Sequence, residues 1–323
     1  MNGAIIGLGH GERVILKAFK LAKIKILGVY SKNLSKSYKY FIKKKLKKHY
    51  LTVDELINDK EVDIVAIAVP AYYQTDLIKK CLIQNKHIFS EKPLTTNYKK
   101  IKKLYSKLQI SKKKFIADYI FQNHKAFIKF KNLLPNKIFE EAKINIIFKT
   151  QSYVNKNKIR NWKNNPILGG GIINLYLPHI IQYLIFFFGP ILYCKKIIKN
   201  SNSVKINYFL KSGITAYVNI CSNETKREHS ISYEDKKTKL ILKNNTRDYA
   251  KGFKIKKTDK IKGKNKIILY NNRINSFKGD GRILLSYDLI KLFFSKFDIN
   301  EHQKKIKEYM LIESILDETR KLV

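Results

Sequence analysis

The sequence is poor in cysteine, in arginine and in acidic residues, and each shortage excludes a class of protein. Its three cysteines, Cys81, Cys194 and Cys221, are odd in number and far apart in a chain of 323 residues. They form neither a disulfide framework nor a zinc signature, and they fit a reducing compartment, so we expect a cytoplasmic protein. The seven histidines show no metal-ligand spacing, and we expect no metal.

Acidic residues are scarce enough to leave a formal net charge of +41, which by itself would suggest a nucleic-acid partner. However, only seven of the 66 basic residues are arginine, the side chain that reads bases through paired hydrogen bonds. Lysine, isoleucine and asparagine are enriched along the whole chain, which points to drift from an AT-rich coding sequence. We therefore expect a solvated basic surface and no specific nucleic-acid partner, although the runs at 43–48 and 254–266 could hold polyanions weakly.

The start of the chain lacks the pattern of a secretory leader, because "MNGAIIGLGHGE" leads directly into an apolar strand and a glycine turn. One long apolar run stands out at 169–189, "GGGIINLYLPHIIQYLIFFFG". A membrane span of about 20 residues should be nearly free of polar groups. This run contains Asn174, Pro178, His179 and Gln182. We therefore expect a buried helix and no membrane partner.

What the sequence does contain, over its first 120 residues, is a regular alternation of apolar strands and amphipathic helices. Strands are predicted at 3–7, 24–31, 62–70, 87–90 and 113–120. Near-continuous apolar strands are typical of a parallel sheet covered on both faces. Thr52, followed three residues later by Glu55, has the pattern of a capping box at the start of a helix. We therefore predict an α/β protein whose residues 1–120 form an N-terminal Rossmann domain, a doubly wound parallel sheet.

After residue 120 the pattern changes to longer strands in which apolar and polar residues alternate. Beyond a helix at 124–134, such strands are expected at 142–154, 192–198, 204–211, 214–222, 229–234 and 238–243. Two amphipathic helices, at 282–294 and 304–322, follow. This predicts an α+β domain over 121–323 with an open, mostly antiparallel sheet, whose last helix packs back on the first domain.

A glycine-rich turn joins the first predicted strand to the first helix. In "IIGLGHGER", Gly7 permits the tight turn, and Gly9 lets the backbone approach a pyrophosphate that faces the free N–H groups of the helix. The spacing is G-x-G-x-G, with Gly11 in the third place and Glu12 where the full dinucleotide fingerprint has its last glycine. We take Gly7, Leu8, Gly9, Gly11 and Glu12 as candidate dinucleotide contacts.

The second predicted strand ends at Ser31 and Lys32, where an NAD site usually has an acidic residue for the ribose 2′-hydroxyl. A hydroxyl and a cation suit a 2′-phosphate, so we expect NADP in preference to NAD. The alternative is that Lys32 is one more surface lysine in a lysine-rich chain. Val69 and Pro70, at the end of the strand 62–70, are further candidate cofactor contacts.

In "IFSEKPLTTN", a strand leads into Glu91-Lys92-Pro93, and these three residues lie at the carboxyl end of a parallel strand, beside the ligand crevice. With "GLGHGER", "SKN" and the downstream "WKNNPILGGG…H" block, this segment resembles the glucose–fructose oxidoreductase / inositol dehydrogenase / MocA (Gfo/Idh/MocA) family of NAD(P)-dependent oxidoreductases. The resemblance covers almost the whole chain. It implies a Rossmann domain followed by a domain with an open antiparallel sheet, homo-oligomers, and Lys92 beside the nicotinamide, where it assists proton transfer.

The same resemblance places His179 at the substrate. In the family the block reads roughly GGG-x-x-x-D-x-G-x-H-x-x-D, and its Asp and His share one helix face because they lie four residues apart. Here the first acid is Leu175 and the second is Gln182. His179 can still act as a general acid or base, but it needs another partner. Without the resemblance, His179 would be read as a structural histidine on a packed helix.

Three further residues are candidate substrate contacts. Trp162, in "RNWKNNP", could stack on a sugar ring or pack its loop against the core. Arg160 could contact a phosphate or carboxylate, and Tyr176 flanks the helix face of His179.

The sequence thus leads to two function hypotheses. The first is an oxidoreductase that transfers a hydride between NADP or NAD and a secondary alcohol or ketone of a sugar, sugar nucleotide or cyclitol, with Lys92 and His179 as catalytic residues. The alternative is a cofactor-binding homologue with little or no dehydrogenase activity, a sensor or partner subunit, because the family's acid is Leu175 here.

Overall fold

The structure, a computed structural model, describes residues 1–136, 141–151, 161–200, 202–270 and 272–322. The chain forms two compact units. The first consists of Met1–Ile120, Ile167–Gly169 and Arg282–Glu313, and the second of Phe121–Pro166, Gly170–Gly281 and Ser314–Val323. The last helix, α11 (Ile299–Lys321), contributes to both units, because the division falls between Glu313 and Ser314.

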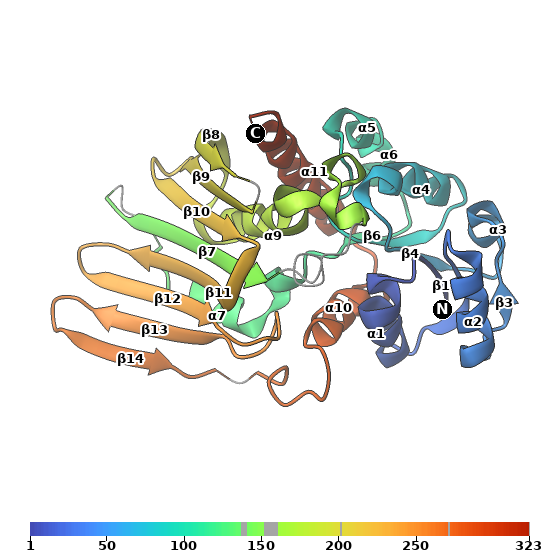
Figure 1. The fold of residues 1–323 in the computed structure, drawn as a ribbon, viewed down its shortest axis with the longest axis horizontal. Coiled ribbons are helices and arrows are strands. Elements are labelled where there is room, and N and C mark those ends of the chain that lie inside the picture. The colour runs from blue at the N-terminus through green and yellow to red at the C-terminus, as the bar shows by residue number, and fades with distance from the viewer. Residues whose placement is uncertain (137–140, 152–160, 201, 271, 323) are drawn as a thin grey trace. The chain divides into compact units, whose positions relative to one another are not determined.

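The first unit is built on a six-stranded sheet in the order β3-β2-β1-β4-β5-β6 (Figure 1). Its strands are β1 (Asn2–Ile6), β2 (Lys25–Tyr30), β3 (Lys48–His49), β4 (Ile64–Ile67), β5 (His87–Ser90) and β6 (Phe115–Ala117). Every neighbouring pair is parallel, and the order reverses between β1 and β4. The predicted doubly wound sheet is confirmed, and such a sheet binds its ligand at the carboxyl ends of the strands beside the reversal point.

The helices of this unit follow from local signals that the sequence carries. They are α1 (Leu16–Leu21), α2 (Leu34–Lys44), α3 (Val53–Asn58), α4 (Ala71–Ile83), α5 (Tyr98–Lys102), α6 (Tyr105–Ile110) and α10 (Arg282–Ile290), with short turns at Gly11–Ile15 and Lys291–Phe293. A further short turn, Ile120–Asn123, spans the division between the units. The hydroxyl of Thr52 accepts a hydrogen bond from the Glu55 N–H at 3.1 Å, as the capping pattern predicts. The Glu55 carboxylate, however, accepts from the N–H of Leu51, one residue before the expected partner.

The second unit is built on an eight-stranded sheet in the order β14-β13-β12-β11-β7-β10-β9-β8 (Figure 1). Its strands are β7 (Lys143–Gln151), β8 (Ile191–Lys199), β9 (Ser203–Leu210), β10 (Thr215–Cys221), β11 (Asn223–Glu234), β12 (Thr238–Asn244), β13 (Lys254–Asp259) and β14 (Lys264–Ile268). Only the pairing of β7 with β10 is parallel, so the predicted mostly antiparallel sheet is confirmed.

The strands β13 and β14 were missed from the sequence, where 254–266 was interpreted as a basic surface run. The two strands pair as a hairpin, and β14 is an edge of the sheet. Ile255 is buried while most lysines of the hairpin remain exposed. Frequent lysines masked the alternation, and on an edge strand they hinder pairing with another chain.

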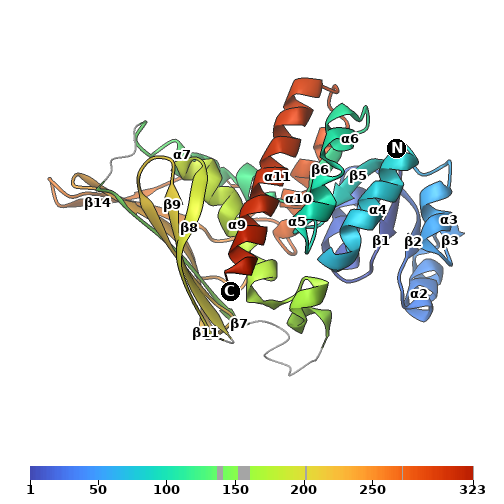
Figure 2. The same cartoon turned by 90° about the horizontal axis from the view of Figure 1, so that it is seen from above.

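Two helices, α7 (Lys125–Lys131) and α9 (Gly171–Phe188), lie against one face of the large sheet (Figure 2). Side chains alternate across that sheet: Ala216 and Val218 are buried, while Tyr217 between them is exposed. Among the described residues, the stretch Pro166–Phe188 is long and apolar enough to cross a membrane, but most of it is buried inside the protein. This is how a core helix behaves, in line with the expectation for 169–189.

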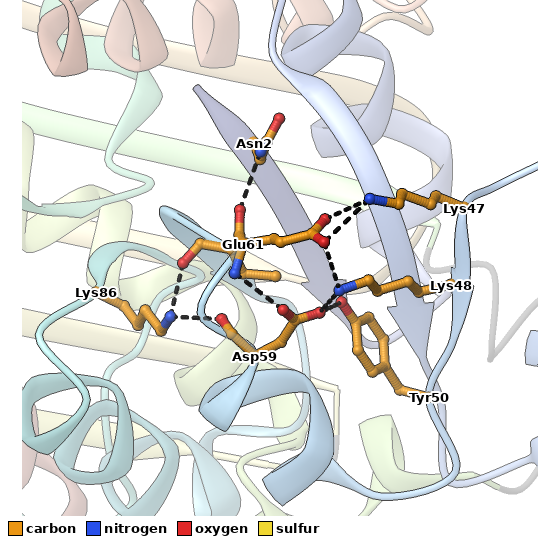
Figure 3. Close-up of polar contacts among 8 residues, drawn as sticks. Asn2, Lys47, Lys48, Tyr50, Asp59, Glu61 and Lys86 are labelled. Atoms are coloured by element: carbon orange, nitrogen blue, oxygen red, sulfur yellow. Dashed lines mark hydrogen bonds and ion pairs between the residues drawn. The ribbon is translucent and has the colours of Figure 1, made fainter.

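At the amino ends of the first unit's strands, a polar network joins segments that are distant in sequence (Figure 3). Oδ2 of Asp59 accepts hydrogen bonds from Nζ of Lys48 at 2.7 Å and from the hydroxyl of Tyr50 at 2.6 Å. The ammonium of Lys86 donates to the carbonyls of Asp59 and Val62, both at 2.7 Å. Burial alone would raise the pKa of Asp59, but the bonds from Lys48 and Tyr50 outweigh it and lower the pKa to about 2.

Replacing Asp59 by Asn should destabilise the protein at neutral pH. The hydrogen bonds in the folded state stabilise the ionised carboxylate of Asp59, and the unfolded state lacks them. A pKa lowered from 3.8 to about 2 corresponds to about 2 kcal/mol of unfolding free energy. This contribution is present above pH 3.8 and is lost as the pH falls through about 2, so the two proteins should converge there. Urea denaturation of both proteins at neutral pH and at about pH 2 measures the difference in unfolding free energy.

The matched control is Asp54→Asn, because the ion pair of Asp54 with Lys80 is between two exposed side chains. It should change stability by less than about 1 kcal/mol. Equal effects of the two substitutions would contradict a special role for the network around Asp59.

Candidate functional site

The glycine turn after β1 has the geometry that a dinucleotide site needs. Gly7 has φ +100°, and a Cβ there would lie 2.3 Å from the carbonyl oxygen of Ala68. A Cβ on Gly9 would meet nothing within 4 Å, so space is open beside this backbone. A Cβ on Gly11 would lie 3.0 Å from Ile5 and 3.2 Å from Ala68, which shows close packing of helix on strand. These are the three tasks of the glycines in a Rossmann turn, and the turn therefore fits a dinucleotide.

A lysine that the sequence interpretation missed reaches this turn from α2. Nζ of Lys36 donates a hydrogen bond to the carbonyl of Leu8 at 2.9 Å and lies 3.8 Å from the carboxylate of Glu12. Glu12, predicted as a cofactor contact, thus holds a cation beside the glycine turn. Nothing in the sequence distinguishes Lys36 from the many lysines around it.

The other predicted cofactor contacts lie at the carboxyl ends of β2 and β4. Ser31 is half-buried and Lys32 is exposed, immediately after the last residue of β2. The carbonyl of Val69 accepts a hydrogen bond from the side-chain amide of Gln74 at 3.2 Å, and Pro70 directly precedes α4. All four residues lie at the edge of the sheet where the crevice is expected.

The Glu91-Lys92-Pro93 segment extends β5 into the same edge, because the Glu91 N–H donates to the carbonyl of Ile67 at 2.9 Å. Desolvation lowers the pKa of Lys92, while the charges of Glu91 and Asp118 act in the opposite direction. A lysine whose pKa is lowered by its surroundings can exchange a proton closer to neutral pH than an exposed one.

The imidazole of His10, between Gly9 and Gly11, lies between a half-buried carboxyl group, Glu91, and a buried one, Asp118. Its Nε2 is 3.0 Å from Oε1 of Glu91 and 3.8 Å from Oδ2 of Asp118. Burial alone would lower the pKa of His10, but the two carboxylates outweigh it and raise the pKa to about 9. Burial, and then the charge of Glu91, raise the pKa of Asp118.

The sequence interpretation did not include His10 or Asp118 in the site, because three separate strand ends bring the cluster together. In the part of the chain that the structure describes, His10, Glu91 and Asp118 are the one group of three potential metal-ligand side chains whose ligand atoms lie within 4.8 Å of one another. The signal that could have found the cluster is positional: each residue follows closely on a parallel strand, and such strand ends meet at one edge.

The predicted substrate residues belong to the second unit. The ring of His179 packs edge-on against Phe121 with centroids 5.2 Å apart, and the ring of Tyr176 lies 4.9 Å from that of Phe148. Burial raises the pKa of Tyr176, and the charge of Arg227 acts against that shift. Leu175, one turn before His179, is half-exposed.

Two polar residues near His179 on α9 form hydrogen bonds with other parts of the second unit. Asn174 is buried; its amide donates to the carbonyl of Gly170 at 2.7 Å, and its oxygen accepts from Nε of Arg320 at 2.7 Å. Gln182, at the position of the family's second acid, is buried and donates to the side chain of Gln122 at 3.4 Å. Asn174 therefore fixes the start of α9.

The loop before α9 is described in part. Trp162 is half-buried in a short 3-10 turn, Trp162–Asn164, which precedes a second one, Pro166–Leu168. A Cβ on Gly170 would lie 2.2 Å from the carbonyl oxygen of Trp162, so the close approach that this glycine permits is to the protein's own backbone. Arg160 lies outside the described residues.

Gly9→Val should abolish dinucleotide binding without loss of stability, because a side chain at Gly9 enters open space rather than the core. The midpoint of thermal unfolding should change by less than about 2 °C, while NADPH and NADH no longer titrate the protein in calorimetry. Gly11→Val is the matched control, and it should lower the midpoint because its side chain meets Ile5 and Ala68. Unchanged binding by Gly9→Val would contradict the assignment of the turn.

The comparisons with known proteins agree with this geometry. Residues 1–119 match the sequence model of the Gfo/Idh/MocA oxidoreductase family, described by its NAD-binding Rossmann fold. An uncharacterized oxidoreductase of Synechocystis sp. is 25% identical over 275 residues, which are 78% of this chain and 74% of that protein.

Solved structures share the fold over nearly the whole chain. Levoglucosan dehydrogenase, in complex with NADH and levoglucosan, has a TM-score of 0.78 at 11% identity and covers 99% of this chain and 97% of its own. A 3-ketoreductase from Actinomadura kijaniata, in complex with TDP-benzene and NADP, has a TM-score of 0.75 at 12% identity and covers 98% of this chain and 96% of its own. At these identities the likeness concerns the fold. The match to the Gfo/Idh/MocA family model thus covers the first domain, residues 1–119, and the likeness over the rest of the chain is one of fold.

Proposed function

We propose that the protein transfers a hydride between a nicotinamide dinucleotide and a secondary alcohol or ketone of a sugar, sugar nucleotide or cyclitol. The observation that carries the proposal is the carboxyl edge of the first sheet, where an open glycine turn follows β1 and a desolvated lysine follows β5, the two strands on either side of β4. The substrate class is supported by two structural neighbours, which were solved with levoglucosan and with TDP-benzene.

The dinucleotide would be held by the glycine turn, by Ser31 and Lys32 after β2, and by Val69 and Pro70 after β4. When bound, the nicotinamide supplies the hydride acceptor or donor. Lys92 holds or moves the proton at the substrate's carbinol oxygen, and the desolvation that lowers its pKa makes that exchange possible near neutral pH. His179 assists as a second acid or base, and Trp162 and Tyr176 contact the substrate.

Lys92→Ala should lower kcat by about 10²- to 10⁴-fold, the usual loss when a general acid or base is removed. NADPH affinity should change little, because the glycine turn that carries the binding is intact. Steady-state kinetics with a turned-over sugar and calorimetry with NADPH separate the two effects. Lys99→Ala, an exposed lysine in α5, is the control and should retain full activity. Full turnover by Lys92→Ala would eliminate the proposed role.

We also propose a preference for NADP, because β2 is followed by Ser31 and Lys32 and not by an acid. Lys36, which reaches the glycine turn from α2, adds a second positive charge nearby. A hydroxyl and a cation favour a phosphate on the ribose over a free 2′-hydroxyl.

Lys32→Glu should shift the preference from NADPH toward NADH by about tenfold or more. A carboxylate repels the 2′-phosphate of NADPH and accepts a hydrogen bond from the 2′-hydroxyl of NADH. The ratio of the two dissociation constants, measured at a salt concentration that screens the basic surface, gives the shift. Lys20→Glu makes the same change of charge on an exposed face of α1 and should leave the ratio unaltered. A shift of equal size in both variants would show an effect of net charge alone.

A second candidate function follows from Leu175. A leucine cannot orient the imidazole of His179 or accept a proton, so the chain could bind its cofactor and act as a sensor or partner subunit with little turnover. The two functions differ in one observable: whether a panel of sugars and sugar nucleotides changes the redox state of bound nicotinamide.

We propose, finally, that the protein is a homo-oligomer. Tyr193, Ile198 and Tyr217 are exposed on strands of the large sheet, and apolar side chains of this size on a sheet face favour association with a second copy.

A further inference from the structure

The ion-paired histidine in the glycine turn has no part in the function proposed above. His10 lies between Gly9 and Gly11, but its side chain turns toward the carboxyl groups of Glu91, after β5, and Asp118, after β6. Asp118 is 3% exposed, and its Oδ1 accepts a hydrogen bond from the hydroxyl of Ser286 on α10 at 3.2 Å. One imidazole therefore joins the turn after β1 to the ends of two other strands.

We propose that His10 is a positioning residue of the dinucleotide site, whose imidazolium ties the glycine turn to the carboxylates of Glu91 and Asp118. The proposal rests on the proposed function, because it assigns His10 a task in holding the cofactor. The tie fixes the backbone between Gly9 and Gly11, which approaches the dinucleotide. It also fixes Glu91, the residue that directly precedes Lys92. One side chain thus sets the distance between the cofactor turn and the lysine segment.

The surrounding charges favour an imidazolium over a metal-bound imidazole. Desolvation lowers the pKa of Lys92, the charges of Glu91 and Asp118 oppose that shift, and the charge of Arg282 adds to it. From α11, Glu313 acts on Lys92, and the charge of Asp118 acts on the hydroxyl of Tyr309. The ammonium of Lys92 already interacts with both carboxylates, so a divalent cation bound there would be repelled by a positive charge that is present.

The pH behaviour of the cluster gives the proposal a signature. The pKa of His10 is raised to about 9, so the imidazole is charged at neutral pH and loses its charge as the pH rises through that value. The ion pairs of His10 with Glu91 and Asp118 are then lost. NADPH affinity should therefore be highest between the pKa of Asp118, which is raised to about 7, and that of His10, and it should fall as the pH rises through about 9.

The experiment measures NADPH dissociation constants for wild type, His10→Ala and His10→Gln from slightly acidic pH to about one unit above the His10 pKa of about 9. His10→Ala should bind about ten- to hundredfold more weakly at neutral pH, the range for loss of an interaction with a charged group. His10→Gln retains a hydrogen-bond donor without the charge, so it should bind with intermediate affinity and without the alkaline fall. Lys92→Ala, which leaves His10 in place, should retain that fall.

Two results would overturn the proposal. The first is an alanine variant that binds NADPH as tightly as wild type with the same pH profile. The second is stoichiometric zinc in the purified wild type that is absent from His10→Ala, because His10 would then be a neutral metal ligand. If His10→Ala does not fold, the glutamine variant and the wild-type pH profile decide. Wild type that binds no NADPH at all would instead refute the proposed function, and this inference with it.

Discussion

The carboxyl edge of the parallel sheet depends on one ion pair, that of His10 with Glu91. The glycine turn after β1 and the segment after β5 are separate loops. The imidazole between the carboxyl groups of Glu91 and Asp118 holds these two segments together. Other contacts stabilise the rest of this sheet. The network around Asp59 joins the opposite, amino ends of the strands, and Gly11 packs closely on Ile5 at the start of the first helix.

The same edge concentrates the titratable chemistry of the first unit. Desolvation lowers the pKa of Lys92, while burial and then the charge of Glu91 raise the pKa of Asp118. Groups whose pKa values are moved toward neutrality in a cleft are the usual components of proton transfer. The second unit offers His179 fewer polar partners from α9. The side-chain oxygen of Asn174 accepts a hydrogen bond from Arg320, and the residue one turn before His179 is a leucine. The lysine segment therefore carries more of the proposed mechanism than the histidine does.

Much of the fold could be read from the sequence because its signals are local. Apolar strands and the glycine turn lie within a few residues of each other, and their periodicity survives the lysine-rich composition. The hairpin of β13 and β14 was hidden by lysines at most positions of the run 254–266. His10, Asp118 and Lys36 were not predicted as site residues, since their roles arise from contacts between segments tens of residues apart. Asn174 could not be assigned for the same reason, because its partner lies on the last helix.

The most direct test of the account is an equilibrium titration of the purified wild-type protein with NADPH and NADH by calorimetry, at a salt concentration that screens its net charge of +41. The account predicts saturable binding of one dinucleotide per chain, with NADPH bound more tightly than NADH. Absence of saturable binding for both would contradict it, because the open glycine turn and the lysine segment would then form a Rossmann scaffold that holds no cofactor.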